Sequence, residues 1–169
     1  MRIDPILILT TGGTIDKHYF DSLSKYQIVD TVVERLLAVA RVAHDYTVEE
    51  VLRKDSLDLT EEDRAWVVEH ARRAESSRIV ITHGTDTMTL TASALSAIPD
   101  KAIVLTGALA PARFSESDAA FNLGMAFATA QIAPPGVYIT MNGSVCRGDR
   151  VTKDHELGRF VLKGNTERK

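Results

Sequence analysis

Two residues with complementary chemistry stand side by side in the middle of the chain. Thr85 and Asp86 follow a short apolar run at residues 79–82 and precede a segment with helical spacing. A threonine hydroxyl is a weak nucleophile at neutral pH, and a neighbouring base or proton path activates it. A lysine paired with the carboxylate would complete such a group, and Lys153 is available for this. The pattern therefore indicates nucleophilic or acid–base chemistry.

Simpler interpretations exist for the same residues. Threonine and aspartate are favoured helix caps, so either Thr85 or Asp86 would suit the start of the following helix. Capping accounts for one of these two side chains but not for both. Most lysines lie on the protein surface, which is the ordinary expectation for Lys153.

A second threonine follows the first apolar run of the chain. Gly12-Gly13 allows a tight turn after residues 6–9 and places Thr14 just beyond it. Glycines are also common in plain turns, which is the more frequent explanation when no other feature is present. The G-x-x-x-x-G-K-[ST] spacing of a phosphate-binding loop is absent. The turn alone is therefore weak evidence that Thr14 is a nucleophile. The stronger evidence is that Thr85, Asp86 and Lys153 follow it in the chain.

The elements that would position these residues are short buried strands that alternate with helices. Apolar, β-branched runs without clean alternation predict parallel strands covered on both faces. These runs are residues 6–9, 79–82, 102–105 and 137–140, with a weaker fifth candidate at 41–48. The order predicts an α/β fold, a three-layer αβα sandwich with a mostly parallel, Rossmann-like sheet. In such sheets ligands bind beyond the carboxyl ends of the strands.

Helical periodicity fills the gaps between the strands. The apolar stripes are Val33, Leu36, Leu37 and Ala40; Trp66, Val67, His70, Ala71 and Ala74; Met88, Ala92 and Leu95; and Ala120, Leu123, Phe127 and Ala130. Thr31 with Glu34 fits a capping box, and Thr60 begins a similar T-x-x-D pattern. Residues 16–28 are polar and lack periodicity, which predicts a mobile loop over the ligand crevice.

Composition limits what the chain binds. Its 169 residues fit one domain, and a formal charge of −3 without a basic run argues against nucleic acid. The one cysteine, Cys146, has no internal partner, and the five histidines lack metal-ligand spacing, so no metal is expected. The N-terminal apolar run is too short for a signal peptide, and no stretch approaches the ~18 apolar residues of a membrane span. We therefore expect a cytoplasmic protein that does not enter a membrane.

Five blocks, in order, resemble the bacterial-type L-asparaginase family. Two match its threonine signatures: Thr11-Gly12-Gly13-Thr14-Ile15 and His83-Gly84-Thr85-Asp86-Thr87-Met88. The other blocks are residues 55–60, residues 107–111 followed by Ser117-Asp118 and Asn122-Leu123, and residues 148–153. The similarity spans nearly the whole chain, and five ordered blocks do not agree by chance.

The resemblance implies hydrolysis of the L-asparagine side-chain amide to L-aspartate and ammonia, without a metal or organic cofactor. By position, Thr14 matches the nucleophile, and Tyr26 matches a lid tyrosine beside it. Thr85, Asp86 and Lys153 match a second threonine, an aspartate and a lysine that act together. The family usually assembles as dimers or tetramers, so a homo-oligomer is expected.

The resemblance also implies a set of substrate-binding residues. Ser56 matches the residue that grips the substrate α-carboxylate, and Ala108 matches a position whose backbone carbonyl contacts the scissile amide. Asp55 belongs to the block of Ser56, and Gly84 belongs to the second threonine signature; these two residues complete the expected binding set.

Two departures from the family pattern change these expectations. Typical members are about twice as long, with a C-terminal domain whose acidic residue binds the α-ammonium of a neighbouring subunit's substrate. This chain resembles a short form with one catalytic domain over residues 1–169, in which that acidic residue has no counterpart. The substrate ammonium would then be held by a local acid, Asp55, Asp58 or Asp86, or by a residue across another interface. Leu57 replaces a polar substrate contact, losing a hydrogen bond of roughly 0.5–1.5 kcal/mol. We expect a raised Michaelis constant and low activity on glutamine.

Two alternative functions stay open at this point. The same chemistry would serve another small amide or a peptide. A non-catalytic module that binds asparagine or aspartate is the other alternative, although mere binding does not need a nucleophile.

Overall fold

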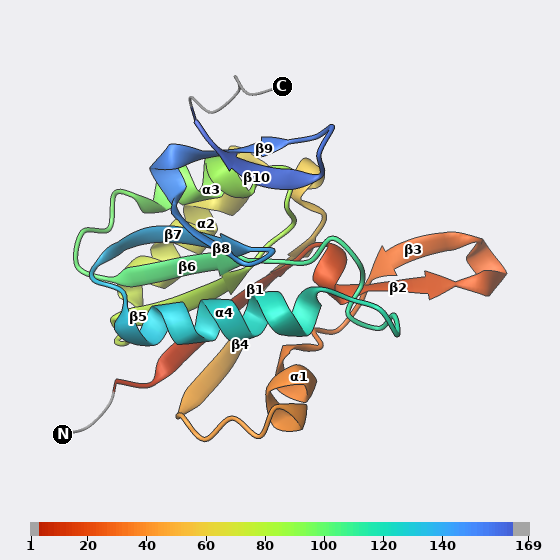
Figure 1. Cartoon of the computed structure of the whole chain (residues 1–169), viewed down its shortest axis with the longest axis horizontal. Helices are drawn as coiled ribbons and strands as arrows, with labels where there is room; N and C mark the ends of the chain where they lie inside the picture. The colour runs from red at the N-terminus through yellow and green to blue at the C-terminus, as the bar shows by residue number, and fades with distance from the viewer. Residues whose placement is uncertain (1–3, 164–169) are drawn as a thin grey trace.

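The computed structural model describes residues 4–163, which contain a six-stranded sheet in the order β4-β1-β5-β6-β7-β8 (Figure 1). The strand bounds are β1 Ile6–Gly12, β4 Tyr46–Lys54, β5 Arg78–Thr82, β6 Ala102–Thr106, β7 Gly136–Met141 and β8 Ser144–Arg147. The first five strands in this order run parallel, and β8 is antiparallel to β7. The mostly parallel sheet expected from the apolar runs is confirmed.

Helices cover both faces of the sheet. They are α1 Val33–Val39, α2 Glu61–Arg73, α3 Met88–Leu95 and α4 Ala119–Ile132. Ile79 and Ile81 of β5 belong to the core shared with α2 and α3, whereas Val80 belongs to the core shared with α1 and α4. A strand buried on both faces has no polar face, which explains its unbroken apolar sequence. Among residues 4–163 no helix is long and apolar enough to cross a membrane.

Two small antiparallel pairs extend from this body. β2 Lys17–Phe20 pairs with β3 Lys25–Ile28, and β9 Val151–Asp154 pairs with β10 Arg159–Leu162. The β2–β3 hairpin projects from the sheet, whereas β9 lies beside α3 (Figure 1). Four short 3-10 helices connect elements: η1 Thr14–Asp16, η2 Asp21–Leu23, η3 Ser56–Asp58 and η4 Gly148–Arg150.

The expectation of an irregular loop at residues 16–28 is wrong. The segment is the β2–β3 hairpin, in which Tyr19 and Tyr26 are cross-strand partners with ring centroids 5.0 Å apart. Ser24 takes a left-handed conformation at its turn. A two-stranded ribbon exposed on both faces needs no apolar alternation, so its sequence carries no strand period.

The weak fifth strand is real but lies further along the chain than predicted. The prediction is residues 41–48, whereas β4 begins at Tyr46 and ends at Lys54. It is an edge strand paired only with β1, and its outward positions include Glu49, Glu50 and Arg53. Charged residues on an edge strand weaken the apolar signal that locates the central strands.

The two predicted capping boxes have different outcomes. Thr60 and Asp63 form the reciprocal box at the start of α2, as predicted. The Thr31–Glu34 box is wrong, because Val32 is the N-cap of α1 and no side chain caps it. Asp16 Oδ1 accepts the Val32 N–H at 2.9 Å instead. This bond ties the start of α1 to the base of the hairpin.

Candidate active site

Three turns meet at the carboxyl end of the parallel sheet. Thr10 of β1, Thr82 of β5 and Thr106 of β6 are register partners, so the segments that follow these strands begin at one level. The first two of these segments touch at Gly13 and Gly84, where a Cβ on Gly13 would lie 2.5 Å from the Gly84 nitrogen. Gly13 also has a φ of 85°, which side chains other than glycine rarely adopt. Gly12-Gly13 is therefore more than a plain turn. The lack of a side chain at Gly13 lets the two threonine segments come into contact at Gly84.

Thr14 and Thr85 each follow one glycine of this contact. Thr14 is the first residue of η1 and is partly buried. Thr85 is 7% exposed and lies between β5 and α3. The structure thus places both predicted threonines beside the same backbone contact.

Lys153 joins Thr85 and Asp86 in one hydrogen-bonded group. Its Nζ donates to Thr85 Oγ1 at 2.8 Å and also bonds the Asp86 carboxylate. The Lys153 side chain is only 12% exposed, so the expectation of a surface lysine is wrong. The capping interpretation is wrong as well, because Thr87 is the N-cap of α3 and makes no side-chain capping bond.

This group is suited to moving a proton at a hydroxyl. The Lys153 ammonium stabilises negative charge on Thr85 Oγ1, and Asp86 balances the charge of the lysine. A fourth residue, His155, lies with Nδ1 3.9 Å from Asp86 Oδ1, and no sequence pattern points to it. It follows Lys153 by two residues on an exposed turn, so only the position of β9 reveals the proximity.

Ser56 lies directly against the Thr85 turn. A Cβ on Gly84 would come within 2.6 Å of Ser56 Oγ, and Thr87 Oγ1 donates to the Ser56 carbonyl at 2.8 Å. Ser56 is 1% exposed, and its hydroxyl finds no hydrogen-bond partner within the described part of the chain. A buried hydroxyl without a partner is costly unless it serves a ligand or water. Ser56 and Gly84, both predicted to bind substrate, are therefore brought together.

Asp55 makes an ion pair with the hairpin. Its Oδ2 lies 2.7 Å from Lys17 Nζ, and its Oδ1 accepts the Leu57 N–H at 3.2 Å. Burial alone would raise the pKa of Asp55, but hydrogen bonds from Lys17 and Leu57 outweigh burial and lower the pKa. Asp55 is thus held as a carboxylate beside Ser56.

Ala108 belongs to a loop fixed by Asp118. The Asp118 carboxylate accepts the N–H groups of Leu109 and Ala110, each at 3.0 Å, and the Asn122 amide at 2.8 Å. Burial would raise the pKa of Asp118, but these hydrogen bonds together lower it. Ala108 itself is 1% exposed and packs in a small core with Ile15, the residue after Thr14. Asp118 thus positions the backbone of the loop that carries Ala108.

His83 supports the Thr85 turn from inside the protein. It is fully buried, with Nδ1 2.7 Å from the Gly84 carbonyl and Nε2 2.7 Å from Thr91 Oγ1. A carbonyl only accepts, so Nδ1 carries the proton and Nε2 accepts from Thr91. Burial lowers the pKa of His83 to about 4, and the nearby Arg64 charge acts in the same direction. The sequence shows His83 within a motif but does not reveal this supporting role.

Comparison with known proteins shows which family this chain belongs to. Residues 5–164 match the family described as "Asparaginase, N-terminal". The chain belongs to the asparaginase family. The L-asparaginase of Thermococcus kodakarensis is 35% identical over 163 residues, a match that covers 90% of this chain and 48% of that protein.

Further comparisons agree with the asparaginase match. A solved structure described as the thermostable L-asparaginase from Thermococcus kodakarensis has a TM-score of 0.81 at 32% identity, covering 94% of this chain and 51% of that one. A glutamyl-tRNA(Gln) amidotransferase subunit of Methanococcus maripaludis is 32% identical, covering 99% of this chain and 41% of that protein. This asparaginase-family chain thus spans about half the length of the relatives it matches.

One predicted residue of the asparaginase set, Tyr26, lies on the hairpin. Tyr26 is 50% exposed on β3, where its ring faces Tyr19 and lies 6.1 Å from the Phe114 ring by centroid. Among residues 4–163 we find no hydrogen bond between Tyr26 and Thr14. The hairpin therefore places the tyrosine in a hollow that Asp55 also lines, without a hydrogen bond to the predicted nucleophile in the described residues.

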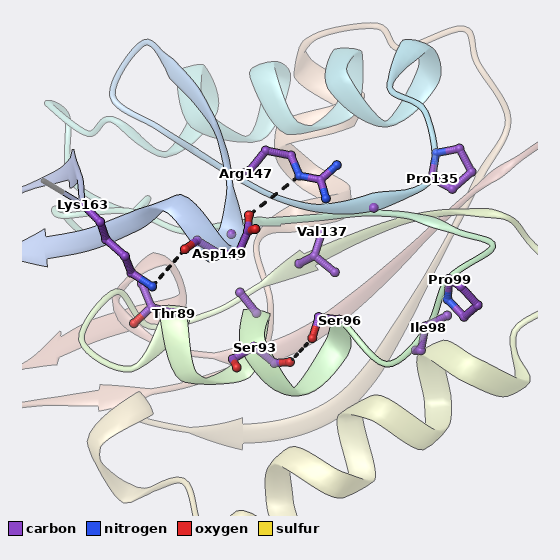
Figure 2. Close-up of a pocket in the computed structure, with 13 residues that line it drawn as sticks. Thr89, Ser93, Ser96, Ile98, Pro99, Pro135, Val137, Arg147, Asp149 and Lys163 are labelled. Atoms are coloured by element: carbon purple, nitrogen blue, oxygen red, sulfur yellow. Dashed lines mark hydrogen bonds and ion pairs between the residues drawn. The ribbon is translucent and has the colours of Figure 1, made fainter.

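A separate hollow of about 430 Å³ lies between α3 and the segments β7, β8 and η4 (Figure 2). Thr89, Ser93 and Ser96 of α3 line one side, and Arg147 and Lys163 line the other (Figure 2). None of the predicted asparaginase site residues lines it, so it is not the candidate active site. The described residues also contain no group of three His, Cys, Asp or Glu side chains placed to hold a metal ion.

Proposed function

We propose that this chain is an L-asparagine amidohydrolase that releases L-aspartate and ammonia. The observation that carries the proposal is the bonding of Lys153 to both Thr85 and Asp86 at the carboxyl end of a parallel sheet. Relatives of 35% identity named L-asparaginase support the choice of substrate. A binding module would have no need for a buried lysine aimed at a hydroxyl.

In this proposal Thr14 is the nucleophile. Its hydroxyl oxygen adds to the side-chain carboxamide carbon, the C–N bond breaks, and the hydroxyl proton leaves with ammonia. The remaining β-aspartyl ester is cleaved by water, whose proton is relayed through the Thr85 hydroxyl while the Lys153 ammonium stabilises charge on Thr85 Oγ1. Thr14 regains its proton when aspartate departs. We propose that the hairpin moves to bring Tyr26 to Thr14, since the tyrosine ring is half exposed in this structure.

Substrate selectivity depends on the residues that we propose to contact the substrate outside the reacting amide carbon. We propose that Ser56 Oγ donates to the substrate carboxylate and that the Ala108 carbonyl accepts from the amide nitrogen. Leu57 is 70% exposed and offers no polar contact at a position that is usually polar in the family. The chain should therefore favour asparagine over glutamine. Comparable kcat/KM values for the two amides would contradict this part of the proposal.

A second candidate keeps the chemistry and changes the amide. It is favoured by the match to the glutamyl-tRNA(Gln) amidotransferase subunit, which covers 99% of this chain. In that case the same threonines release ammonia from a different amide. Ammonia assays with asparagine, glutamine and short peptides that end in asparagine distinguish the two candidates by the order of kcat/KM.

The direct test compares ammonia release by wild type, Thr14→Ala and Thr85→Ala. We expect both variants to lose at least about a hundredfold in kcat, as for loss of a nucleophile or proton-transfer group. Rapid acid quenching followed by mass spectrometry should find an aspartyl group on Thr14 of the wild type. Undiminished turnover by Thr14→Ala would remove it as nucleophile. Binding of aspartate without turnover by the wild type would favour a sensor.

Assembly and compartment are separate proposals. We propose a cytoplasmic homo-oligomer, a dimer or tetramer, on the basis of the family resemblance and the free Cys146. Sedimentation velocity of the chain checks the assembly, and a concentration-independent monomer would contradict it. Cell fractionation checks the compartment.

A further inference from the structure

The hollow between α3 and the segments β7, β8 and η4 has the size and the lining of a small-molecule site (Figure 2). Its volume of about 430 Å³ lies within the range of ligand pockets, roughly 300–1,000 Å³. Such pockets combine apolar walls with a few polar groups that orient the ligand. Both kinds of lining are present here: Lys163 and Thr89 lie at one end, and Ile98 and Pro99 lie at the other (Figure 2).

Arg147 presents a cation to the hollow, and β7 holds this cation in place. Arg147 is the register partner of Tyr138, and its Cζ lies 5.5 Å from the centroid of the tyrosine ring. A Cβ on Gly136 would lie 2.9 Å from Arg147 Nη1, so the guanidinium lies over this glycine. Among residues 4–163 the guanidinium donates no hydrogen bond, and its ion pair with Asp149 is long, at 3.8 Å. Its donors are therefore available to a ligand, and stacking on the ring orients them.

A second cation and hydroxyl groups of α3 complete the polar lining. Lys163 is fixed to η4, because its Nζ donates to the Asp149 carbonyl at 2.9 Å and its N–H to the Arg150 carbonyl at 2.8 Å. Thr89 and Ser93 are four residues apart, so their hydroxyls lie on one face of α3. The lining contains two cations and the Asp149 carboxylate, which leaves a single net positive charge.

Apolar side chains line the rest of the hollow. Ile98 and Pro99 follow α3, Pro135 precedes β7, and Val137 lies within β7. These residues edge the core, since Ile98 is 3% and Val137 7% exposed. An aliphatic group that covers them leaves water, which favours binding.

We propose that this hollow binds a small monocarboxylate with an aliphatic body. The carboxylate accepts hydrogen bonds from the Arg147 guanidinium, whose fork matches two carboxylate oxygens. One negative charge balances the net charge of the lining. A phosphate monoester carries roughly 1.5–2 negative charges at neutral pH and would leave an excess, so the charge decides for a carboxylate. The aliphatic body lies on Ile98, Pro135 and Val137.

The ligand in this position bridges two elements that lead into the Lys153 group without touching it. α3 begins two residues after Asp86, and η4 leads directly into β9. The two elements meet at the hollow, where a Cβ on Gly148 would lie 3.0 Å from that of Ala92. Neither Thr85 nor Lys153 lines the hollow. The site is therefore independent of the proposed amidohydrolase, and its test needs no turnover.

Calorimetry with four probes tests the charge and the body of the ligand separately. Hexanoate has both features, hexanamide lacks the charge, acetate lacks the aliphatic body, and inorganic phosphate offers the other anion. We expect hexanoate to bind about tenfold or more tightly than hexanamide, as for one bond to a charged group. Acetate and phosphate should also bind more weakly than hexanoate. Absence of hexanoate binding at millimolar concentration overturns the proposal, and so does equal or tighter binding of any other probe.

Variants locate the binding in this hollow. Arg147→Met changes a side chain that is 51% exposed, so the fold should survive, as circular dichroism checks. It should weaken hexanoate about tenfold or more and leave hexanamide unchanged. Ser93→Leu fills the hollow from α3 and should weaken both probes. The matched control is Arg150→Met, which removes an exposed arginine that does not line the hollow and should change neither.

The variants also exclude binding at another place. Hexanoate bound by the candidate active site would be insensitive to both Arg147→Met and Ser93→Leu. Unchanged hexanoate affinity in these two variants therefore overturns the proposal. An equal loss of affinity in Arg147→Met and Arg150→Met also overturns it, because the surface charge of the protein would then account for the binding.

Discussion

Lys153 and Thr85 are 68 residues apart in the chain, yet Lys153 Nζ donates to Thr85 Oγ1 at 2.8 Å. The lysine comes from β9, outside the main sheet, and the threonine from the turn between β5 and α3. Gly148 lets the two parts approach, because a Cβ there would lie 3.0 Å from that of Ala92 in α3. The position of β9 against α3 therefore determines whether the group forms.

His83 should make stability depend on pH. Burial lowers its folded pKa to about 4 from 6.5, so below pH 6.5 the unfolded chain takes up a proton that the folded chain does not. The free energy of unfolding contributed by His83 is complete above pH 6.5 and falls as the pH drops toward 4. The total loss is about 3 kcal/mol at 1.36 kcal/mol per pKa unit.

Urea unfolding between pH 4 and pH 7.5 measures this effect. The difference between wild type and His83→Gln isolates it from the acidic groups, and His18→Gln on the exposed hairpin is the control. We expect His83→Gln to flatten the pH dependence and His18→Gln to retain it. Parallel curves for wild type and His83→Gln would show that His83 accepts its proton in the folded state.

Gly84 should tolerate no side chain. A Cβ there would lie 2.6 Å from Ser56 Oγ and 3.0 Å from the Ser56 nitrogen, so Gly84→Ala must displace the serine segment. We expect a loss of about 1–3 kcal/mol in stability from overpacking, together with a raised KM. Gly124→Ala in α4 is the matched control, because no atom lies within 4 Å of its added Cβ.

Gly124→Ala should stabilise the chain by about 0.5–1 kcal/mol, since alanine is the better helix former. Thermal unfolding and asparagine kinetics of the two variants provide the comparison. An active Gly84→Ala with unchanged KM would mean that Ser56 does not bind substrate where we place it.

Asp118 should control kcat without touching substrate. Asp118→Ala removes the acceptor of the Leu109 and Ala110 N–H groups, and each unpaired group costs about 1–3 kcal/mol if it stays buried. The loop carrying Ala108 then loses its fixed position, so we expect kcat to fall more than KM rises. Glu116→Ala, an exposed acid two residues earlier, should change neither. A normal kcat in a folded Asp118→Ala would show that the loop holds its shape without the carboxylate.

The sequence predicts the parts of the fold that are buried on both faces. The predicted β5 and β6 agree with the structure within one residue because their apolar runs are unbroken. The exposed hairpin and the edge strand β4 are missed or shifted, because burial imposes little pattern on them. The strands β9 and β10 are not predicted for the same reason, because they lie outside the main sheet.

The candidate site is predictable where a motif follows a strand. Thr14, Gly84 and Thr85 follow β1 and β5, so sheet topology alone brings them together. The roles of His83 and Asp118 depend on hydrogen bonds to backbone groups of neighbouring turns, which no residue pattern indicates. The pairing of Lys17 with Asp55 requires the hairpin, an element absent from the sequence prediction.

The central claim is that the Lys153 group drives amide hydrolysis, and ammonia release from L-asparagine by Lys153→Met tests it most directly. Thr152→Ala, an exposed neighbour on β9, serves as the control. With correct folding shown by circular dichroism, we predict a fall in kcat of about 10²–10⁴ for Lys153→Met and none for Thr152→Ala. A kcat for Lys153→Met within a factor of two of the wild type would contradict the account.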